Sequence, residues 1–256
     1  MAEHTFSIER AAILEGVPHG FFGSCSGVHQ FGFGGPGDAE DIRALRNAAA
    51  GAILPGAPLQ TPQQVHSPEV ITLSQPPSKK WPDHATDRPV ADALVTDRTD
   101  VVIGIVTADC GPVLFADRGA GVVGAAHAGW RGAHGGVLES TLKAMEGLGA
   151  ERANIVALLG PMIAQSSYEV DAEFCAEFGP ADALHFKAAG VREGAERWQF
   201  DLPGYILKCL RQSGLTTISV LGRDTHHESD SYYSYRRAVQ NGAPDYGRQL
   251  SAIAVG

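Results

Sequence analysis

Residues 101–130 have the sequence VVIGIVTADCGPVLFADRGAGVVGAAHAGW, and this stretch decides the fold. It contains three short apolar runs, at 101–106, 112–116 and 121–126, with segments rich in Asp and Gly between them. Each run has the length of a strand and is apolar at consecutive positions, whereas a strand with one solvated face alternates apolar and polar residues. The stretch therefore predicts buried strands in a sheet that is covered on both faces.

The flanking sequence predicts helices between further strands. Asp38 is a candidate N-cap of a helix that ends near Leu54, before Pro55. Pro203 and Gly214 have the positions expected at the start and the end of another helix. Residues 135–145 and 171–179 are also expected to be helical, and residues 65–73, 91–97, 155–160, 217–222 and 250–256 to be extended. No linker interrupts the pattern, so we expect one mixed α/β domain spanning residues 1–256.

Two segments are expected to be loops. Residues 74–89 hold four prolines without periodicity, which favours an insertion or a mobile region. Residues 32–37 are rich in glycine, and the sequence leaves open whether they form a turn or a lid.

Composition and charge exclude several classes of protein. The 256 residues carry a formal net charge of −9, whereas proteins that bind nucleic acids usually present a basic surface to the phosphates. No apolar segment typical of a signal peptide follows the first residues, and no run approaches the roughly 18 apolar residues that span a membrane. Cysteines without regular spacing indicate reduced thiols in a cytoplasmic protein. They are Cys25, Cys110, Cys175 and Cys209.

Three residues form a candidate metal site. Cys110 and His127 each end a predicted buried strand, and His66 lies where a loop enters an extended segment. If the first two strands are neighbours in one sheet, their side chains converge at its edge. One thiolate and two imidazoles form a three-ligand zinc site with an open fourth position, and they also suit copper. The ordinary alternative is a buried apolar cysteine beside histidines that only form hydrogen bonds.

Charged residues near these ligands are further candidates. Asp109 would orient a ligand or a proton transfer, with the capping of a turn as the alternative. Arg131 would clamp a phosphate or a carboxylate, with a surface salt bridge as the alternative. Residues 226–237, HHESDSYYSYRR, would bind a phosphate through Arg236 and stack a base on tyrosines. The favoured interpretation of this last segment is an edge strand with alternating aromatic and charged sides.

Eight sequence blocks occur in the order found in one known family. They are TPQQVHS (61–67), ADALVTD (91–97), TADCGPVLFAD (107–117), AAHAGWRG (125–132), LGPMIAQSSYEV (159–170), FDLPG (200–204), YYSYRR (232–237) and YGRQ (246–249). In these blocks the chain resembles the laccase-domain, or polyphenol oxidase-type, proteins from about His19 to Gly256. The TADC and HAGWRG blocks together are highly specific.

The resemblance implies a four-layer α/β/β/α sandwich and a zinc ion at the positions of His66, Cys110 and His127. The activities it implies are phosphorolysis of adenosine, inosine, guanosine and methylthioadenosine, and deamination of adenosine. The family has also been described as copper-dependent phenol oxidases and as editing enzymes for a cell-wall precursor. A multicopper oxidase holds its metals through many histidines, and the ten histidines here form no His-X-His pair, so copper oxidation is the least favoured activity.

The chain departs from the family pattern at three places. Ser24 stands where the family has an arginine, Asp224 replaces a cysteine, and Ser166 and Ser167 precede Tyr168 where the family often has a cysteine. If the missing arginine binds phosphate or ribose, its loss weakens the case for phosphorolysis and favours deamination or hydrolysis.

The leading hypothesis is a zinc-dependent purine nucleoside enzyme that takes a nucleoside and phosphate as its small-molecule partners. Asp109 and Gln64 would shuttle a proton and orient water for deamination at C6. Arg131 or Arg236 would hold phosphate against the ribose C1′ in phosphorolysis. Tyr168 and Arg236 are the expected substrate-binding residues.

The main alternative is a hydrolase in which Cys110 is a nucleophile that His127 activates, with an amide or ester of a cell-wall precursor as substrate. A non-enzymatic binding role also stays open. Neither a nucleic acid nor a membrane is expected as partner, and the sequence does not determine the oligomeric state.

Overall fold

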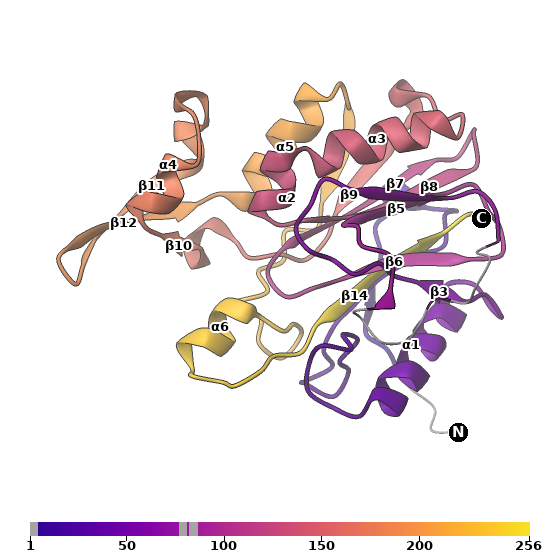
Figure 1. Cartoon of the computed structure of the whole chain (residues 1–256), viewed down its shortest axis with the longest axis horizontal. Helices are drawn as coiled ribbons and strands as arrows, with labels where there is room; N and C mark the ends of the chain where they lie inside the picture. Colours follow the sequence, from indigo (N-terminus) through magenta and orange to yellow (C-terminus); the bar gives the residue numbers. More distant parts are fainter. Residues whose placement is uncertain (1–4, 77–80, 82–86) are drawn as a thin grey trace.

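Two β-sheets stack face to face in the computed structural model, which describes residues 5–76, 81 and 87–256 (Figure 1). Within these residues, one sheet has six strands in the order β13-β9-β7-β8-β5-β4. They are β4 (Val70–Leu73), β5 (Ala93–Thr96), β7 (Gly111–Asp117), β8 (Val122–Ala128), β9 (Val156–Leu159) and β13 (Thr217–Val220). The other sheet has five strands in the order β1-β2-β14-β6-β3. They are β1 (Ile8–Glu9), β2 (His19–Phe22), β3 (Leu59–Gln60), β6 (Val102–Thr107) and β14 (Gln249–Ala254).

Helices cover the outer face of each sheet (Figure 1). On the five-stranded sheet lies α1 (Ala39–Ile53). The six-stranded sheet is covered by α2 (Trp130–Gly135), α3 (Val137–Gly147) and α5 (Leu202–Gln212). The layers therefore follow the order helix, sheet, sheet, helix, and the expected four-layer α/β/β/α sandwich with mixed sheets is confirmed.

The stacking of the sheets explains why the strands of residues 101–130 are apolar on both faces. Leu94 and Leu114 of the six-stranded sheet meet Ile103 and Ile105 of the five-stranded sheet, and all four are fully buried. The opposite faces of both sheets pack against the helices in two further apolar clusters. Each buried Leu or Ile stabilises the fold by about 1.5–3 kcal/mol, so an apolar residue is favoured at every position of such a strand.

The condition that the strands before Cys110 and His127 are neighbours in one sheet is not met, because β6 and β8 belong to different sheets. The chain crosses from the five-stranded sheet to the six-stranded sheet between β6 and β7, and β7 then pairs with β8 in antiparallel orientation. Because the two strands run in opposite directions, the start of β7 lies beside the end of β8. Gly111 is paired with Ala128, and Pro112 with His127.

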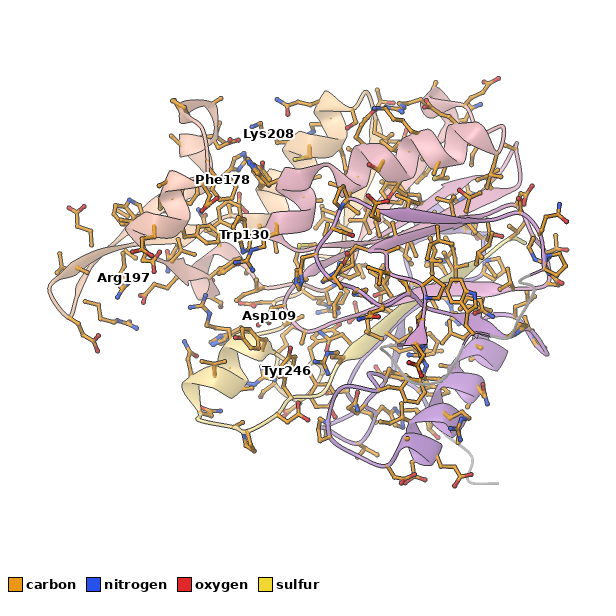
Figure 2. All side chains as sticks on the ribbon, in the orientation of Figure 1. Asp109, Trp130, Phe178, Arg197, Lys208 and Tyr246 are labelled. Atoms are coloured by element: carbon orange, nitrogen blue, oxygen red, sulfur yellow. The ribbon has the colours of Figure 1, made fainter. Side chains whose placement is uncertain are left out.

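A small third sheet projects from the sandwich as an arm (Figure 1). It consists of β10 (Glu169–Val170), β12 (Ala195–Phe200) and β11 (Phe186–Arg192), and α4 (Ala172–Ala176) lies beside it. Phe174 and Phe178 pack at its base with ring centroids 4.8 and 5.9 Å from that of Trp130, and Figure 2 marks the positions of Phe178 and Trp130. The sequence did not predict β11 and β12, because their mostly exposed positions carry no apolar period.

The favoured edge-strand interpretation of residues 226–237 is wrong. Residues from Tyr235 onward form a helix, α6 (Tyr235–Gln240), and the Ser234 side chain caps it by accepting a hydrogen bond from the Arg237 backbone N–H. A capped helix start was readable in Ser-Tyr-Arg-Arg, but the alternation of tyrosines and serines outweighed it.

Most other predicted elements are confirmed. The helix from Asp38 and the helix that holds Pro203 near its start are α1 and α5, and the helix expected at 135–145 is α3, whereas α2, which ends at Gly135, was not predicted. In the predicted loop 74–89, residues 77–80 and 82–86 lie outside the described residues. No helix in the described part of the chain has the length and apolar character needed to cross a membrane.

Candidate metal centre and substrate cavity

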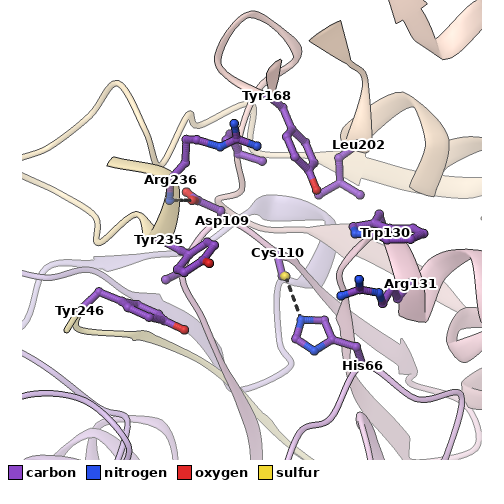
Figure 3. Close-up of a pocket in the computed structure, with 12 residues that line it drawn as sticks. His66, Asp109, Cys110, Trp130, Arg131, Tyr168, Leu202, Tyr235, Arg236 and Tyr246 are labelled. Atoms are coloured by element: carbon purple, nitrogen blue, oxygen red, sulfur yellow. Dashed lines mark hydrogen bonds between the residues drawn. The ribbon is translucent and has the colours of Figure 1, made fainter. Parts of the chain in front are cut away.

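His66, Cys110 and His127 converge at one end of the six-stranded sheet. Cys110 occupies the crossover just before β7, and the β7–β8 register brings it to His127. His66 approaches from the loop before β4, with its Nε2 3.7 Å from the Cys110 Sγ (Figure 3). One potential ligand atom from each of the three residues lies within 4.8 Å of the other two. The antiparallel pairing of β7 with β8 therefore brings together Cys110 and His127, two of the residues that the sequence proposed as ligands.

Asp92 holds both histidines, and sequence reasoning missed it. Its carboxylate is fully buried and accepts hydrogen bonds from the backbone N–H groups of Val65, His66 and Ser67 and from the Ser67 hydroxyl. It also binds the Nδ1 of His127 at 2.7 Å. With Nδ1 directed at a carboxylate, His127 presents Nε2 to the centre, which is the usual arrangement behind a metal-bound histidine. The ADALVTD block contained this signal, since it placed an aspartate at the start of a buried strand.

The close approach of Cys110, the two histidines and Asp92 determines the charge states of Cys110 and His127. Burial by itself would raise the pKa of the Cys110 thiol, but His127 and His66 lower it to about 6. Burial by itself would lower the pKa of His127, but the Cys110 thiolate and the Asp92 carboxylate raise it to about 9. Between these values the pair is a thiolate and an imidazolium, and the sulfur is ready to bind a metal or to attack an electrophile.

The donor set fits zinc. With Zn–S near 2.3 Å and Zn–N near 2.0–2.1 Å, tetrahedral ligand atoms lie roughly 3.5 Å apart, close to the 3.7 Å between Cys110 and His66. Three protein ligands leave one position open, as in catalytic zinc sites. Copper accepts the same ligands. Among the described residues this is the one group of three or more potential ligands, whereas a multicopper oxidase needs several such groups.

A cavity of about 380 Å³, here named the aromatic cavity, opens on the metal ligands (Figure 3). His66 and Cys110 form part of its wall, and four aromatic residues line it. These are Trp130, Tyr168, Tyr235 and Tyr246. An apolar, aromatic cavity with a few charged groups is typical of a site for a planar organic ligand.

Four predicted site residues besides the candidate metal ligands line this cavity, and they are Asp109, Arg131, Tyr168 and Arg236. Arg131 lies over the Trp130 ring at 4.7 Å, and Arg236 lies over the Tyr168 ring at 5.4 Å. Burial, with the nearby Cys110 charge, raises the pKa of the Tyr168 phenol, so it remains a neutral donor. By contrast, Arg237 donates to backbone carbonyls and braces the loop before α6.

Asp109 and Gln64 lie close to the candidate ligands, but their side chains are held in hydrogen bonds with other protein groups. Asp109 accepts hydrogen bonds from the Thr225 hydroxyl, the Ser234 hydroxyl and the Arg236 backbone N–H, so it fixes the start of α6 beside the site. The Gln64 side chain donates to the Val106 carbonyl and accepts from the Val106 N–H. A role in proton transfer or water orientation is therefore not supported by this geometry for either residue.

Two of the three departures from the family pattern meet each other. The Ser167 hydroxyl donates to the Asp224 carboxylate at 2.6 Å, and Asp224 also accepts from the backbone of Ala164 and His226. Ser24 is buried against the backbone of Asp230 and is not part of the aromatic cavity.

Comparisons with known proteins identify the family and support the fold. The family model described as multi-copper polyphenol oxidoreductase laccase matches residues 19–256. A Deinococcus radiodurans protein named purine nucleoside phosphorylase is 36% identical over 236 residues, covering 86% of this chain and 84% of the relative. Escherichia coli K12 purine nucleoside phosphorylase YfiH is 35% identical over 207 residues, covering 81% and 79%. The crystal structure of a Neisseria meningitidis protein superposes with a TM-score of 0.78 at 29% identity, covering 98% of this chain and 99% of that one. The crystal structure of Bacillus licheniformis YfiH has a TM-score of 0.82 at 22% identity, covering 95% and 94%, and supports the fold alone.

Replacement of Gly129 by a residue with a side chain is predicted to weaken metal binding. A Cβ at this position would lie 2.7 Å from the Cys110 Sγ and 3.0 Å from the His66 Cδ2, although the backbone, with φ −68°, would accept alanine. We expect Gly129→Ala to fold and to bind zinc about tenfold more weakly or worse, as seen when ligand positioning is disturbed. Gly135→Ala is the matched control, because nothing lies within 4 Å of its Cβ position. Equal zinc affinity in a chelator competition would contradict this packing argument.

Asp92→Asn tests the carboxylate that orients both histidines. An amide cannot accept from all the donors around Asp92, so we expect zinc affinity to fall by about 10–100-fold. Its His127 hydrogen bond overcomes the effect of burial and lowers the pKa of Asp92 to about 2. The stability gained from this carboxylate is therefore present above about pH 4 and is lost as the pH falls toward 2. Asp38→Asn, at an exposed helix cap, is the control and should change neither quantity.

The Cys110 thiol is predicted to react at unusually low pH in metal-free protein. Because its pKa is lowered to about 6, alkylation by iodoacetamide should be fast above pH 6 and slow below it, and zinc should block it. Burial raises the pKa of Cys175 and Cys209, which serve as internal controls and should react slowly at neutral pH. Peptide mass spectrometry of the alkylated protein measures all three rates. A midpoint above pH 8 for Cys110 would refute the charged pair.

Proposed function

We propose that this chain, which belongs to the family described as multi-copper polyphenol oxidoreductase laccase, is a zinc-dependent purine nucleoside phosphorylase. The observation that carries the proposal is the aromatic cavity, which opens on His66 and Cys110 and so joins a site for a planar base to a metal centre. The relatives named purine nucleoside phosphorylase support the same reaction.

The cavity has the chemistry that a purine nucleoside requires. Stacking of a base on an aromatic side chain contributes about 1–3 kcal/mol, and Trp130, Tyr168, Tyr235 and Tyr246 all line the cavity (Figure 3). Arg236 and Arg131 approach it from different elements, α6 and α2. Their guanidinium groups can donate to the ribose hydroxyls and to O6 of inosine or guanosine.

In phosphorolysis, a phosphate oxygen forms a bond to the ribose C1′ while the bond from C1′ to N9 of the purine breaks. The electron pair leaves with the base, which takes up a proton, and ribose 1-phosphate is the second product. A zinc ion held by His66, Cys110 and His127 would supply Lewis-acid polarisation of the reacting groups. The chain's own residues orient the nucleoside and keep the Tyr168 phenol protonated.

Deamination of adenosine is a further activity that we propose for the same site. It takes the same nucleoside in the same cavity, but Asp109 and Gln64, the expected proton carrier and water-orienting residue, are committed to other partners. The geometry therefore supports phosphorolysis more directly than deamination. We propose the cytoplasm as the place of action, because all four cysteines are free.

One observation favours a second function. Asp92, His127 and Cys110 form a hydrogen-bonded chain of acid, base and thiol, which is the arrangement of a cysteine nucleophile. A metal-free Cys110 would then attack an amide or ester carbonyl, such as that of a cell-wall precursor. His66 distinguishes the two functions, because the metal site requires it and the nucleophile does not.

The test is turnover by wild type and by His66→Ala. With adenosine, wild type should release adenine and ribose 1-phosphate only when phosphate is present, and inosine if it deaminates. We expect about one zinc per chain in wild type. We also expect His66→Ala to lose the metal and about a hundredfold or more of the phosphorolysis rate, since a Lewis acid contributes several kcal/mol. His226→Ala, which changes a histidine outside the aromatic cavity, is the control. A zinc-free wild type that hydrolyses esters as fast as His66→Ala would instead establish the thiol hydrolase.

A further inference from the structure

A second cavity of about 270 Å³ lies beside the aromatic cavity, and the two have His66 and Cys110 in common. Its wall combines α1, the glycine-rich segment at 32–34, residues 62–64, the end of β6 and the residues before β14. We name it the basic cavity because Arg46, Arg88 and Arg248 line it. The metal ligands thus lie between two cavities of different chemistry.

The three arginines come from distant parts of the chain and are held in place by the fold. Arg46 and Arg88 both donate to the Thr61 hydroxyl, and their guanidinium groups lie 5.0 and 4.8 Å from the centre of the Phe33 ring. Arg248 enters from the opposite end of the sequence, with its guanidinium 4.4 Å from the centre of the Tyr246 ring. Aromatic rings, the Thr61 hydroxyl and the Phe31 carbonyl hold these cations in place on the cavity wall.

The glycine-rich segment permits this approach. A Cβ at Gly32 would lie 2.7 Å from Cδ of Arg248, and one at Gly35 would lie 3.0 Å from its Nη1. The sequence left open whether residues 32–37 form a turn or a lid. The structure shows a packing role, since two of these glycines make room for the Arg248 side chain.

The rest of the wall also suits an anion. None of the described residues that line the basic cavity is an aspartate or a glutamate, in a chain whose net charge is −9. Thr107, another wall residue, is 2% exposed, and within the described structure its hydroxyl has no hydrogen-bond partner. A buried hydroxyl without a partner costs roughly 1–3 kcal/mol, so its presence points to a ligand that satisfies it.

We propose that the basic cavity binds a phosphate group, and that in catalysis this group is the inorganic phosphate that attacks the nucleoside. The inference rests on the proposed function and changes one part of it, because it assigns phosphate to Arg46, Arg88 and Arg248 rather than to Arg131 or Arg236. A nucleoside in one cavity and a phosphate in the other meet at the two ligands that both walls contain. Arginine is suited to this role because its planar donors bind two phosphate oxygens at once.

With this assignment, the replacement of the family arginine by Ser24 no longer weakens the case for phosphorolysis. Ser24 lines neither cavity, and its hydroxyl donates to the Asp230 carbonyl. The absence of the family arginine at that position therefore leaves the three guanidinium groups of the basic cavity intact.

Binding of inorganic phosphate, measured by titration calorimetry on the purified protein, tests the proposal without relying on turnover. We expect Arg248→Gln and Arg88→Gln each to weaken phosphate binding by about tenfold or more, the loss typical of a charge-assisted hydrogen bond. Arg211→Gln is the matched control, because this exposed arginine on α5 lines neither cavity. Thermal unfolding of every variant establishes that it is folded, and two variants from distant parts of the sequence guard against local distortion.

A parallel titration with AMP separates free phosphate from the 5′-phosphate of a nucleotide. Loss of phosphate binding in both variants, with adenosine binding unchanged, supports the proposal. Loss of AMP binding alone would assign the cavity to a nucleotide phosphate and overturn the role of inorganic phosphate as attacking group. Unchanged phosphate binding in both variants, or its loss in Arg236→Ala instead, would overturn the proposal. If phosphate binds as expected but adenosine is not cleaved, the proposed function fails and the phosphate site stands.

Discussion

The site depends on one buried carboxylate. Asp92 has no exposed surface, and a charge in that position is tolerated only when hydrogen bonds replace its lost water. Three consecutive N–H groups, a hydroxyl and an imidazole do so, and they belong to the two segments that carry the histidine ligands. The same contacts hold His66 at a φ of 63°, which an isolated histidine would seldom adopt. The hydrogen bonds that satisfy the buried Asp92 carboxylate also position His66 and His127. The candidate metal centre therefore forms only when the segments around β5 and β8 are folded together.

The fold was largely predictable because its decisive signal is local. A strand between two apolar layers must be apolar at every position, and residues 101–130 show this pattern three times. The pairing of these strands was not predictable, since each buried run is equally compatible with either sheet. The arm was missed for the opposite reason, because β11 and β12 are mostly exposed and are placed by the aromatic cluster at their base rather than by a pattern of their own.

The candidate site was predictable in residue type but not in partnership. Cysteine and histidine at strand ends indicated a metal, and three such residues do meet. The chemical type of Asp109 and Gln64 also indicated function, yet their partners are hydroxyl and backbone groups 42 to 127 positions away in sequence. Asp92 could be singled out only once those long-range contacts were known. Asp109 and Gln64 thus support the segments around the candidate ligands through hydrogen bonds.

Acidic and basic side chains have different places around the site: carboxylates brace the loops, and guanidinium groups line the cavities. Asp92, Asp109 and Asp224 all turn their carboxylates toward hydrogen-bond donors of the loops that form the site, so part of the acidic composition braces the interior. The Ser167–Asp224 contact fits the same pattern, since two family departures together form one hydrogen bond between the wall segments before Tyr168 and after β13. The cations have the complementary arrangement, with Arg131 and Arg236 at one cavity and Arg46, Arg88 and Arg248 at the other. A net charge of −9 is therefore compatible with the proposed phosphate site, because low-dielectric walls let a local cluster of cations outweigh distant negative charge that salt screens.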